Sequence, residues 1–153
     1  MVHSDFTGQY EHSIDTKNRV NIPSAYRKIL AEMNASEVVI SKGIDSRHID
    51  VYHPEKWDAL IKSLKSKASN NFNPRYRRLI REFAGNASRC KIDSQGRIML
   101  TPHLMEMAGI RQGAKVSIVG IIDIIEIWDL DVYLQDLKDN PLTLDDLESV
   151  GQI

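Results

Sequence analysis

One short polar phrase occurs twice in this chain of 153 residues, and the repetition constrains the fold more than any other feature. The first copy reads IDTKNRVNIP, and the second, half a chain later, reads IDSQGRIMLTP. In both copies an aspartate precedes an arginine by four residues, as Asp15 and Arg19 and again as Asp93 and Arg97. Two units are too few for a solenoid, in which several repeats stack. The repeat therefore predicts one compact domain with pseudo-twofold symmetry.

Each copy of the phrase predicts a hairpin turn followed by a short strand and a helix. Asn18 and Gly96 stand where a tight turn needs a left-handed backbone, which Asn and Gly adopt most easily. After the arginine, apolar and polar residues alternate until a proline ends the strand and opens a helix. The expected helices are PSAYRKIL, with Ser24 as a candidate N-cap, and PHLMEMA. The segments EVVIS and KVSIVG then predict buried strands.

The segment between the two copies predicts two further helices. Apolar residues recur at helical spacing in HPEKWDALIKSLKS and in NPRYRRLIREF, where Asn73 is a candidate N-cap and Pro74 a first helical residue. Residues 67–73 form the expected internal loop. The expected organisation is a first repeat at 5–54, connecting helices at 55–82, a second repeat at 83–130, and an acidic tail at 131–153 that is a short helix or disordered.

The formal net charge of −1 conceals a separation of charge along the chain. Residues 62–91 contain nine Lys or Arg and a single acid, Glu82, whereas residues 121–153 contain nine Asp or Glu and one base, Lys138. A neutral chain divided in this way presents local fields of opposite sign. Two interpretations stay open on charge alone: solvated faces that help subunits to associate, or a surface that binds a polyanion.

No group of residues in the sequence predicts an enzyme or a metal centre. The five histidines lie at no metal-ligand spacing, there is no glycine-rich phosphate loop, and Cys90 lacks the context of a nucleophile. Glu126 is a lone acid in the strand pattern IIEIW, expected to face water or to pair with a base. We therefore expect no catalytic activity, no metal, no cofactor and no small-molecule substrate.

Targeting features are equally sparse. No stretch approaches the roughly 18 apolar residues that a membrane span needs, and the N-terminus lacks the pattern of a signal peptide. A single cysteine cannot form an internal disulfide, which suits a reducing compartment. These features predict a cytoplasmic protein with no membrane partner.

The doubled Asp–Arg pairs stand out because they recur. Four residues apart across a hairpin turn, each aspartate can meet its own arginine. A turn-closing ion pair is the main expectation for Asp15 and Asp93. A guanidinium held at a hairpin tip is suited to phosphate or guanine, which favours a binding role for Arg19 and Arg97. Lys17 adds a second cation to the first tip only.

The order of these motifs resembles the MraZ family of bacterial transcriptional regulators. F-x-G-x-Y is followed by S-I-D-x-K-x-R-V-x-I-P, then by D-x-Q-G-R-I-x-L and I-E-I-W, over roughly residues 5–135. The family pattern usually has Gly before the signature arginine. This chain has Gly96 in the second copy but Asn18 in the first, and Asn is the next-best residue for a left-handed turn.

The resemblance implies both a fold and a function. The implied fold is α+β, an AbrB-like pseudo-twofold β-barrel of swapped hairpins that two internal repeats build within one chain, with short flanking helices. The implied assembly is a ring-shaped homo-oligomer. The implied partner is double-stranded DNA, at short repeated elements upstream of the cell-division and cell-wall gene cluster, which would locate the protein on the nucleoid.

The leading hypothesis is a sequence-specific DNA-binding transcriptional regulator that acts without a cofactor. The first hairpin tip is expected to read DNA, and the second to act mainly as scaffold. The alternative is a protein–protein assembly scaffold without direct DNA readout, in which basic and acidic segments dock neighbouring subunits. The candidate DNA-binding residues are Arg19, Lys17, Arg27 and Arg97, and the turn signature is Asp15, Asn18, Asp93 and Gly96.

Overall fold

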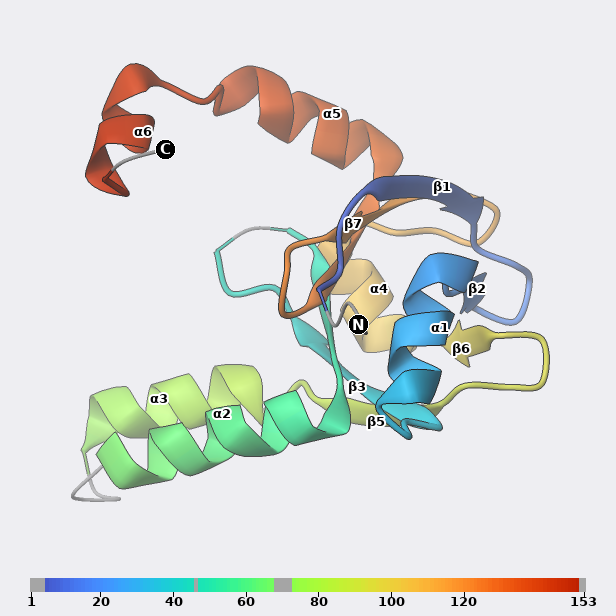
Figure 1. The fold of residues 1–153 in the computed structure, drawn as a ribbon, viewed down its shortest axis with the longest axis horizontal. Coiled ribbons are helices and arrows are strands. Elements are labelled where there is room, and N and C mark those ends of the chain that lie inside the picture. Colours follow the sequence, from blue (N-terminus) through green and yellow to red (C-terminus); the bar gives the residue numbers. More distant parts are fainter. Residues whose placement is uncertain (1–4, 46, 68–72, 152–153) are drawn as a thin grey trace.

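The computed structural model of the chain describes residues 5–45, 47–67 and 73–151, and these form a mixed α+β fold (Figure 1). The α+β class expected from the sequence is confirmed. In chain order the elements are β1 (Gln9–Ser13), β2 (Arg19–Asn21), α1 (Ser24–Glu32), β3 (Glu37–Lys42), β4 (Ile49–Tyr52), α2 (Pro54–Lys67), α3 (Pro74–Phe83), β5 (Ser88–Lys91), β6 (Arg97–Met99), α4 (Pro102–Ala108), β7 (Lys115–Gly120), β8 (Ile125–Asp129), α5 (Leu130–Asp139) and α6 (Leu144–Ser149).

The sheet topology repeats between the two halves of the chain. A six-stranded antiparallel sheet has the order β1-β7-β8-β4-β3-β5, and β2 pairs with β6 in a separate two-stranded ladder. In this sheet β1, β3 and β4 of the first half correspond to β5, β7 and β8 of the second. Exchanging each strand for its counterpart gives the same strand order, read in the opposite direction. The arms of each hairpin therefore pair with different strands: β1 with β7 and β2 with β6, and likewise β5 with β3 and β6 with β2.

The six-stranded sheet is open rather than closed. Its edge strands, β1 and β5, each have one partner within the described residues and do not pair with one another. The two halves exchange strands, but the closed swapped-hairpin barrel implied by the resemblance is not confirmed.

One main hydrophobic core lies under the sheet and takes equivalent residues from both repeats. Val20 of β2 and Ile98 of β6 are both buried in it, opposite one another on their ladder. Helices α1 and α4 cover the same core with Tyr26 and Leu104 among their buried residues. Tyr26 is fixed further because its hydroxyl donates to the backbone carbonyl of Gly8 at 2.7 Å and lies 3.0 Å from that of Thr7, which shares the same hydrogen. A second, smaller cluster under α2 and α3 consists of Val39, Tyr52, Trp57 and Phe83.

Helix ends agree with the sequence only in part. Asn73 caps α3 as expected, since its side chain accepts the backbone N–H of Arg75 at 2.9 Å. Ser24 does not cap α1: it is the first helical residue, Pro23 holds the cap position, and no side-chain cap bond forms. The cap of α4 is Thr101, which accepts the backbone N–H of Leu104. The expected loop at 67–73 lies, apart from its two end residues, outside the described residues.

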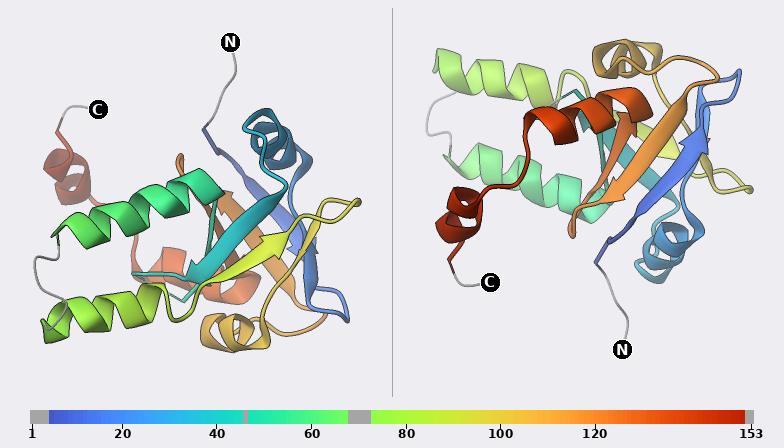
Figure 2. Two further views of the ribbon diagram at one scale, coloured as in Figure 1. Left: turned by 90° about the horizontal axis from the view of Figure 1, so that it is seen from below. Right: turned by 90° about the horizontal axis from the view of Figure 1, so that it is seen from above.

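The two ends of the molecule differ. Both hairpin turns, between β1 and β2 and between β5 and β6, project at one end (Figures 1 and 2). The α2–α3 pair and α6 project at the opposite end. Within the acidic segment, α5 packs on β7 and β8 and buries Tyr133, whereas α6 buries none of its residues. Among the described residues, no helix combines the length and apolar character that crossing a bilayer requires.

Candidate nucleic-acid interface

The two hairpin turns have the same hydrogen-bond pattern. In the first turn, one carboxylate oxygen of Asp15 accepts the backbone N–H groups of Lys17 at 2.9 Å and Arg19 at 2.8 Å. The other oxygen accepts Nε–H of the Arg19 guanidinium at 2.8 Å. Each aspartate therefore closes its own turn and holds its own arginine side chain.

The second turn reproduces these contacts closely. Asp93 accepts the backbone N–H groups of Gln95 and Arg97, both at 2.9 Å, and the Nε–H of Arg97 at 2.9 Å. The expected Asp–Arg pairs therefore form in both copies. Both arginine side chains remain about a quarter exposed, 26% for Arg19 and 23% for Arg97, so their outer nitrogens can still reach a ligand.

The aspartates stay ionised because of these contacts. The backbone N–H of Arg19 chiefly lowers the pKa of Asp15, and the Arg19 guanidinium lowers it further. The pKa of Asp93 is lowered in the same way by Arg97. An ionised carboxylate keeps each guanidinium oriented by a charge-assisted hydrogen bond over the whole neutral pH range.

Asn18 and Gly96 occupy the same left-handed position in the two turns. Their φ angles are 61° and 78°, which confirms the prediction that Asn18 can replace glycine in the first turn. At this point the two halves of the chain also form backbone hydrogen bonds with one another. The backbone N–H of Leu100 donates to the carbonyl of Asn18 at 2.8 Å, and that of Ile22 donates to the carbonyl of Gly96 at 2.9 Å.

The β2–β6 ladder places the two signature arginines on one face. Arg19 is opposite Met99, and Asn21 is opposite Arg97. Residues two positions apart on a strand share a face, so Arg19 and Arg97 are diagonal neighbours, whose Cα atoms are roughly 7–8 Å apart in such a ladder. Asn21 and Met99, both exposed, complete this face, while the opposite face carries buried Val20 and Ile98. We call Arg19, Asn21, Arg97 and Met99 the outer ladder face.

The remaining predicted DNA-binding residues divide between the two turns. Lys17 is exposed in the first turn. Arg27 lies at the second turn, where its side chain covers Gly96 and its Cδ would collide with a Cβ at that position. Arg27 Nε is buried without a hydrogen-bond partner among the described residues. The structure thus gives each turn one additional cation, Lys17 in the first and Arg27 in the second.

Gln112 braces the first turn, a contact that the sequence does not suggest. Its side-chain amide donates to the backbone carbonyl of Thr16 at 3.1 Å and to the side-chain oxygen of Asn18 at 2.9 Å. A residue from the second half of the chain thereby holds the tip of the first hairpin. Its sequence separation from the turn explains why no local pattern could reveal it.

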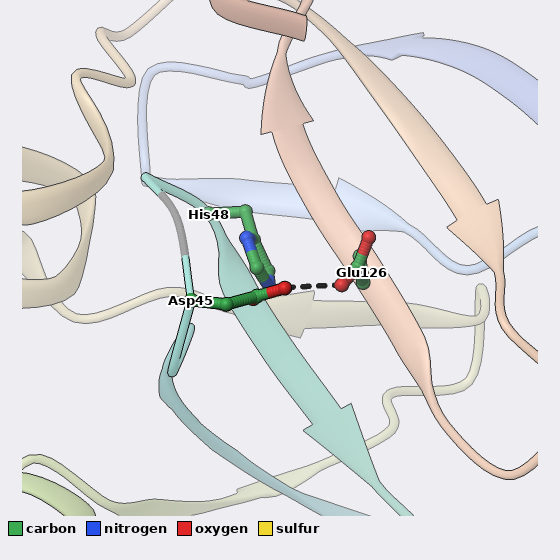
Figure 3. Close-up of side chains that lie close together, drawn as sticks. All are labelled: Asp45, His48 and Glu126. Carbon is green, nitrogen blue, oxygen red and sulfur yellow. Dashed lines mark ion pairs between the residues drawn. The ribbon is translucent and has the colours of Figure 1, made fainter. Parts of the chain in front are cut away.

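A buried charge cluster lies away from the turns, where β4 pairs with β8 (Figure 3). His48 Nε2 is 2.8 Å from a carboxylate oxygen of Asp50 and 2.9 Å from one of Glu126. The His48 ring stacks on Trp128, with 4.7 Å between ring centroids, and the Trp128 indole N–H donates to Glu126 at 2.9 Å. The expectation that Glu126 either faces water or pairs with a base is met by its pairing with His48.

The ionisation states in this cluster follow from its contacts. Burial alone would lower the pKa of His48, but hydrogen bonds to Asp50 and Glu126 raise it to about 9. Glu126 has a lowered pKa because the hydrogen bonds from His48 and Trp128 outweigh the effect of its burial. Burial dominates at Asp50 and raises its pKa. His48 is therefore an imidazolium at neutral pH.

The same cluster contains the one group of potential metal ligands among the residues that the structure describes. Single ligand atoms of Asp45, His48 and Glu126 all lie within 4.8 Å of one another. Sequence spacing did not indicate this group, because Glu126 comes from the other half of the chain. In the structure these groups form ion pairs, with 3.9 Å between His48 Nε2 and an Asp45 carboxylate oxygen and 2.9 Å between His48 Nε2 and one of Glu126.

Comparison with known proteins identifies relatives along most of the chain. The model of the family described as "MraZ protein, putative antitoxin-like" matches residues 6–81 and 83–146. The chain is 32% identical to the transcriptional regulator MraZ of Christiangramia forsetii, covering 87% of this chain and 83% of that protein. It is 32% identical to the protein of the same name from Proteus mirabilis, covering 90% and 88%. For that of Acetivibrio thermocellus the identity is 35%, covering 81% and 80%.

Proposed function

Because the chain belongs to the MraZ family, we propose that it is a DNA-binding transcriptional regulator that acts without catalysis and without a cofactor. Its relatives are named transcriptional regulators, which supports the regulatory role. The proposed partner is double-stranded DNA, and the proposed targets are short repeated elements near cell-division and cell-wall genes. A protein with these targets would work on the nucleoid.

The observation that carries the proposal is the pair of oriented guanidiniums on the outer ladder face. Arg19 and Arg97 are each held by a carboxylate through Nε, which leaves the terminal nitrogens to donate to a ligand. Guanidinium forks suit both DNA phosphates and the O6 and N7 atoms of guanine. A two-stranded ribbon is narrow enough to enter the major groove. The two turns at the same end of the molecule would flank it.

The two tips need not contribute equally. The prediction that the first tip reads DNA and the second serves as scaffold rests on Lys17 and Asn18, which are next to Arg19 in the sequence. The ion pairs themselves are nearly identical in the two turns, which supports contacts from both arginines. We propose Arg19, Arg97 and Lys17 as direct contacts. Arg27 would add positive charge and support the second turn through Gly96.

The proposed architecture is an AbrB-like pseudo-twofold unit formed by the repeats at 5–54 and 83–130. The exchange of hairpin arms between the halves and the palindromic strand order support it. In this proposal residues 55–82 connect the repeats and 131–153 form an acidic appendage. Assembly of several copies into a ring would bring several outer ladder faces to clustered DNA sites, which raises the effective concentration without new contacts.

The test measures DNA binding as a function of salt concentration. A duplex selected from random sequence by the wild-type protein serves as the probe. Replacing Arg19 or Arg97 by Gln should weaken binding by about tenfold or more and reduce the slope of log K against log salt by about 1 for each phosphate that the variant no longer neutralises. The control is Arg89→Gln, since Arg89 is an exposed arginine of β5 that pairs with Glu37 and Asp58.

The effect on binding has to be separated from an effect on folding. If the double variant Arg19→Gln, Arg97→Gln retains the wild-type melting temperature and binds the duplex with unchanged affinity and salt slope, the proposal is wrong. If both variants lose affinity only as far as they lose stability, the arginines are turn-closing groups and nothing more. A loss confined to Arg19→Gln would support a single reading tip.

A further inference from the structure

The acidic C-terminal segment exposes an unusual amount of apolar surface. Half of the exposed large apolar side chains in the described part of the chain lie between residues 134 and 150. Leu144 is 76% exposed and Val150 is 67% exposed, and α6 buries none of its residues. Exposed apolar side chains that lie close together on a polar surface can form a docking site. The exposed set is Leu134, Leu137, Leu142, Leu144, Leu147 and Val150.

Acidic groups accompany this apolar surface. On α6, Leu144 and Leu147 share a face because they are three residues apart, and Asp145 and Glu148 flank it. Within the described residues none of the acids of α5 or α6 takes part in an ion pair. The segment therefore presents unneutralised negative charge around exposed leucines. These acids are Asp131, Asp136, Asp139, Asp145, Asp146 and Glu148.

Helix α3 presents the complementary surface. Its four arginines are exposed, and none of them forms an ion pair with another described residue. A shallow depression of about 450 Å³ runs along the helix, lined by Tyr76, Arg77, Ile80 and Arg81. It combines two half-buried apolar side chains with two guanidiniums. Such a surface fits an acidic amphipathic helix better than a bare phosphate backbone, which has nothing to place against Tyr76 and Ile80.

We propose that α6 of one copy of this chain docks on α3 of a second copy, with Leu144 and Leu147 against the depression and Asp145 and Glu148 paired with its arginines. The occupant is a second copy because each chain carries both halves of the contact. Helix α6 is joined through residues 140–143 to α5, which is fixed on β7 and β8. Its own α3 belongs to a separate protrusion, formed with α2 (Figure 2).

A contact between two different patches has a consequence for assembly. It is heterologous, so it generates a closed ring if the rotation between neighbours closes and an open filament if it does not. It uses the end of the molecule opposite the hairpin turns, which leaves the outer ladder face free in every subunit. The contact concerns assembly only, so it stands or falls separately from DNA readout.

The experiment is a charge exchange followed by sedimentation velocity. One variant carries Arg77→Glu and Arg81→Glu, and the other carries Asp145→Arg and Glu148→Arg. Asp146 is left unchanged because it forms a capping box with Thr143. Each variant alone should self-associate at least about tenfold more weakly than the wild type, because like charges then face one another. Mixing the two variants should restore association, and so should combining all four substitutions in one chain.

Three other results would overturn the proposal. Unchanged association of both variants means that subunits meet elsewhere, for example at the edge strands β1 and β5. A second result combines two measurements: the wild-type chain is monomeric at all concentrations, and a variant with Leu79→Cys, Leu147→Cys and Cys90→Ser forms a cross-link within one chain. This result means that α6 docks on its own α3. Loss of DNA binding by the α3 variant with assembly intact means that α3 binds nucleic acid. Circular dichroism of each variant confirms that the helices are retained.

Discussion

Asp50 and Glu126 are directly opposite one another on the β4–β8 ladder, and Nε2 of His48 lies 2.8 Å from a carboxylate oxygen of Asp50 and 2.9 Å from one of Glu126. The two acids occupy equivalent places in the repeats, in IDVY and IEIW. Like charges directly opposite on an antiparallel pair repel, and both side chains are largely buried. A protonated His48 between them converts this repulsion into two attractive contacts at the junction of the two halves.

The stability of the fold should therefore fall in alkaline solution. The pKa of His48 is raised from its ordinary 6.5 to about 9 in the folded protein. A group with a raised folded pKa contributes stability that is fully present below its unfolded pKa and is lost as pH rises through the folded pKa. The window is therefore pH 6.5 to about 9, and the loss is at most on the order of 3 kcal/mol. Urea unfolding at several pH values measures it.

The matched control is His48→Gln, which is neutral at every pH. It should be less stable than wild type at about pH 6, because Asp50 and Glu126 then face each other without a cation. Its stability should change much less between pH 6.5 and about 9 than that of the wild type. The carboxyl groups facing His48 from its loop and from both strands are Asp45, Asp50 and Glu126. Equal pH dependence of the two proteins would contradict the assignment.

Glycine is required at position 96 for two separable reasons. Its φ of 78° strains any residue with a Cβ, and Arg27 occupies the space that the Cβ would enter. Gly113 has nearly the same φ, 77°, with nothing within 4 Å of its Cβ position. Gly113→Ala should thus cost only the strain of a left-handed backbone, about 1 kcal/mol, whereas Gly96→Ala should cost more. Thermal unfolding of the two variants compares them, and a cost for Gly96→Ala no larger than for Gly113→Ala would contradict a close contact with Arg27.

The repeats could be predicted from sequence because their signals are local. Asp15 and Arg19 are four residues apart, so a single turn brings them together, and the turn formers between them define that turn. The same holds for the left-handed Asn18 and for the Asn73 cap. Helices and strands also followed from periodicity, since alternation and helical spacing are properties of short windows.

Contacts between the halves of the chain could not be predicted in this way. The pairing of β2 with β6 sets Arg19 beside Arg97, and no local pattern gives the partner of a three-residue strand. Nothing in the sequence distinguishes His48 from the other four histidines, because the pairing of β4 with β8 is what brings Glu126 to it. Arg27 was predicted as a candidate DNA contact, but the sequence does not reveal that its side chain covers Gly96 of the second turn. These contacts depend on the symmetry of the whole fold, which the individual elements do not reveal.

The single thiol should react slowly. Cys90 is on the edge strand β5, but its side chain is buried, and Sγ is 3.3 Å from the carbonyl oxygen of Met99. Burial raises the pKa of the Cys90 thiol, so little thiolate is present at neutral pH. Labelling with a thiol reagent should proceed many times more slowly than for the same chain in denaturant. Equal rates would mean that β5 opens freely from β3.

Replacing Asp15 or Asp93 by asparagine or by alanine should separate the two roles of the aspartates, which are to close the turn and to hold the arginine side chain. Asparagine can still accept the two backbone N–H groups of the turn through its side-chain oxygen, but it loses the charge that holds the arginine Nε. Alanine loses all three hydrogen bonds. We therefore expect Asp15→Asn to melt close to the wild type and Asp15→Ala to melt lower, with the same order at Asp93.

DNA binding should respond differently from stability in these variants. If the aspartates orient the guanidiniums, Asp15→Asn should weaken binding to the selected duplex severalfold despite its intact turn, because Arg19 then samples more rotamers before it docks. Asp93→Asn measures the same effect for Arg97, and unequal losses would rank the two tips. Removing a negative charge next to DNA also strengthens nonspecific attraction, so the comparison is made at two salt concentrations. Tighter binding of Asp15→Asn at both salts would show that Asp15 serves the turn alone.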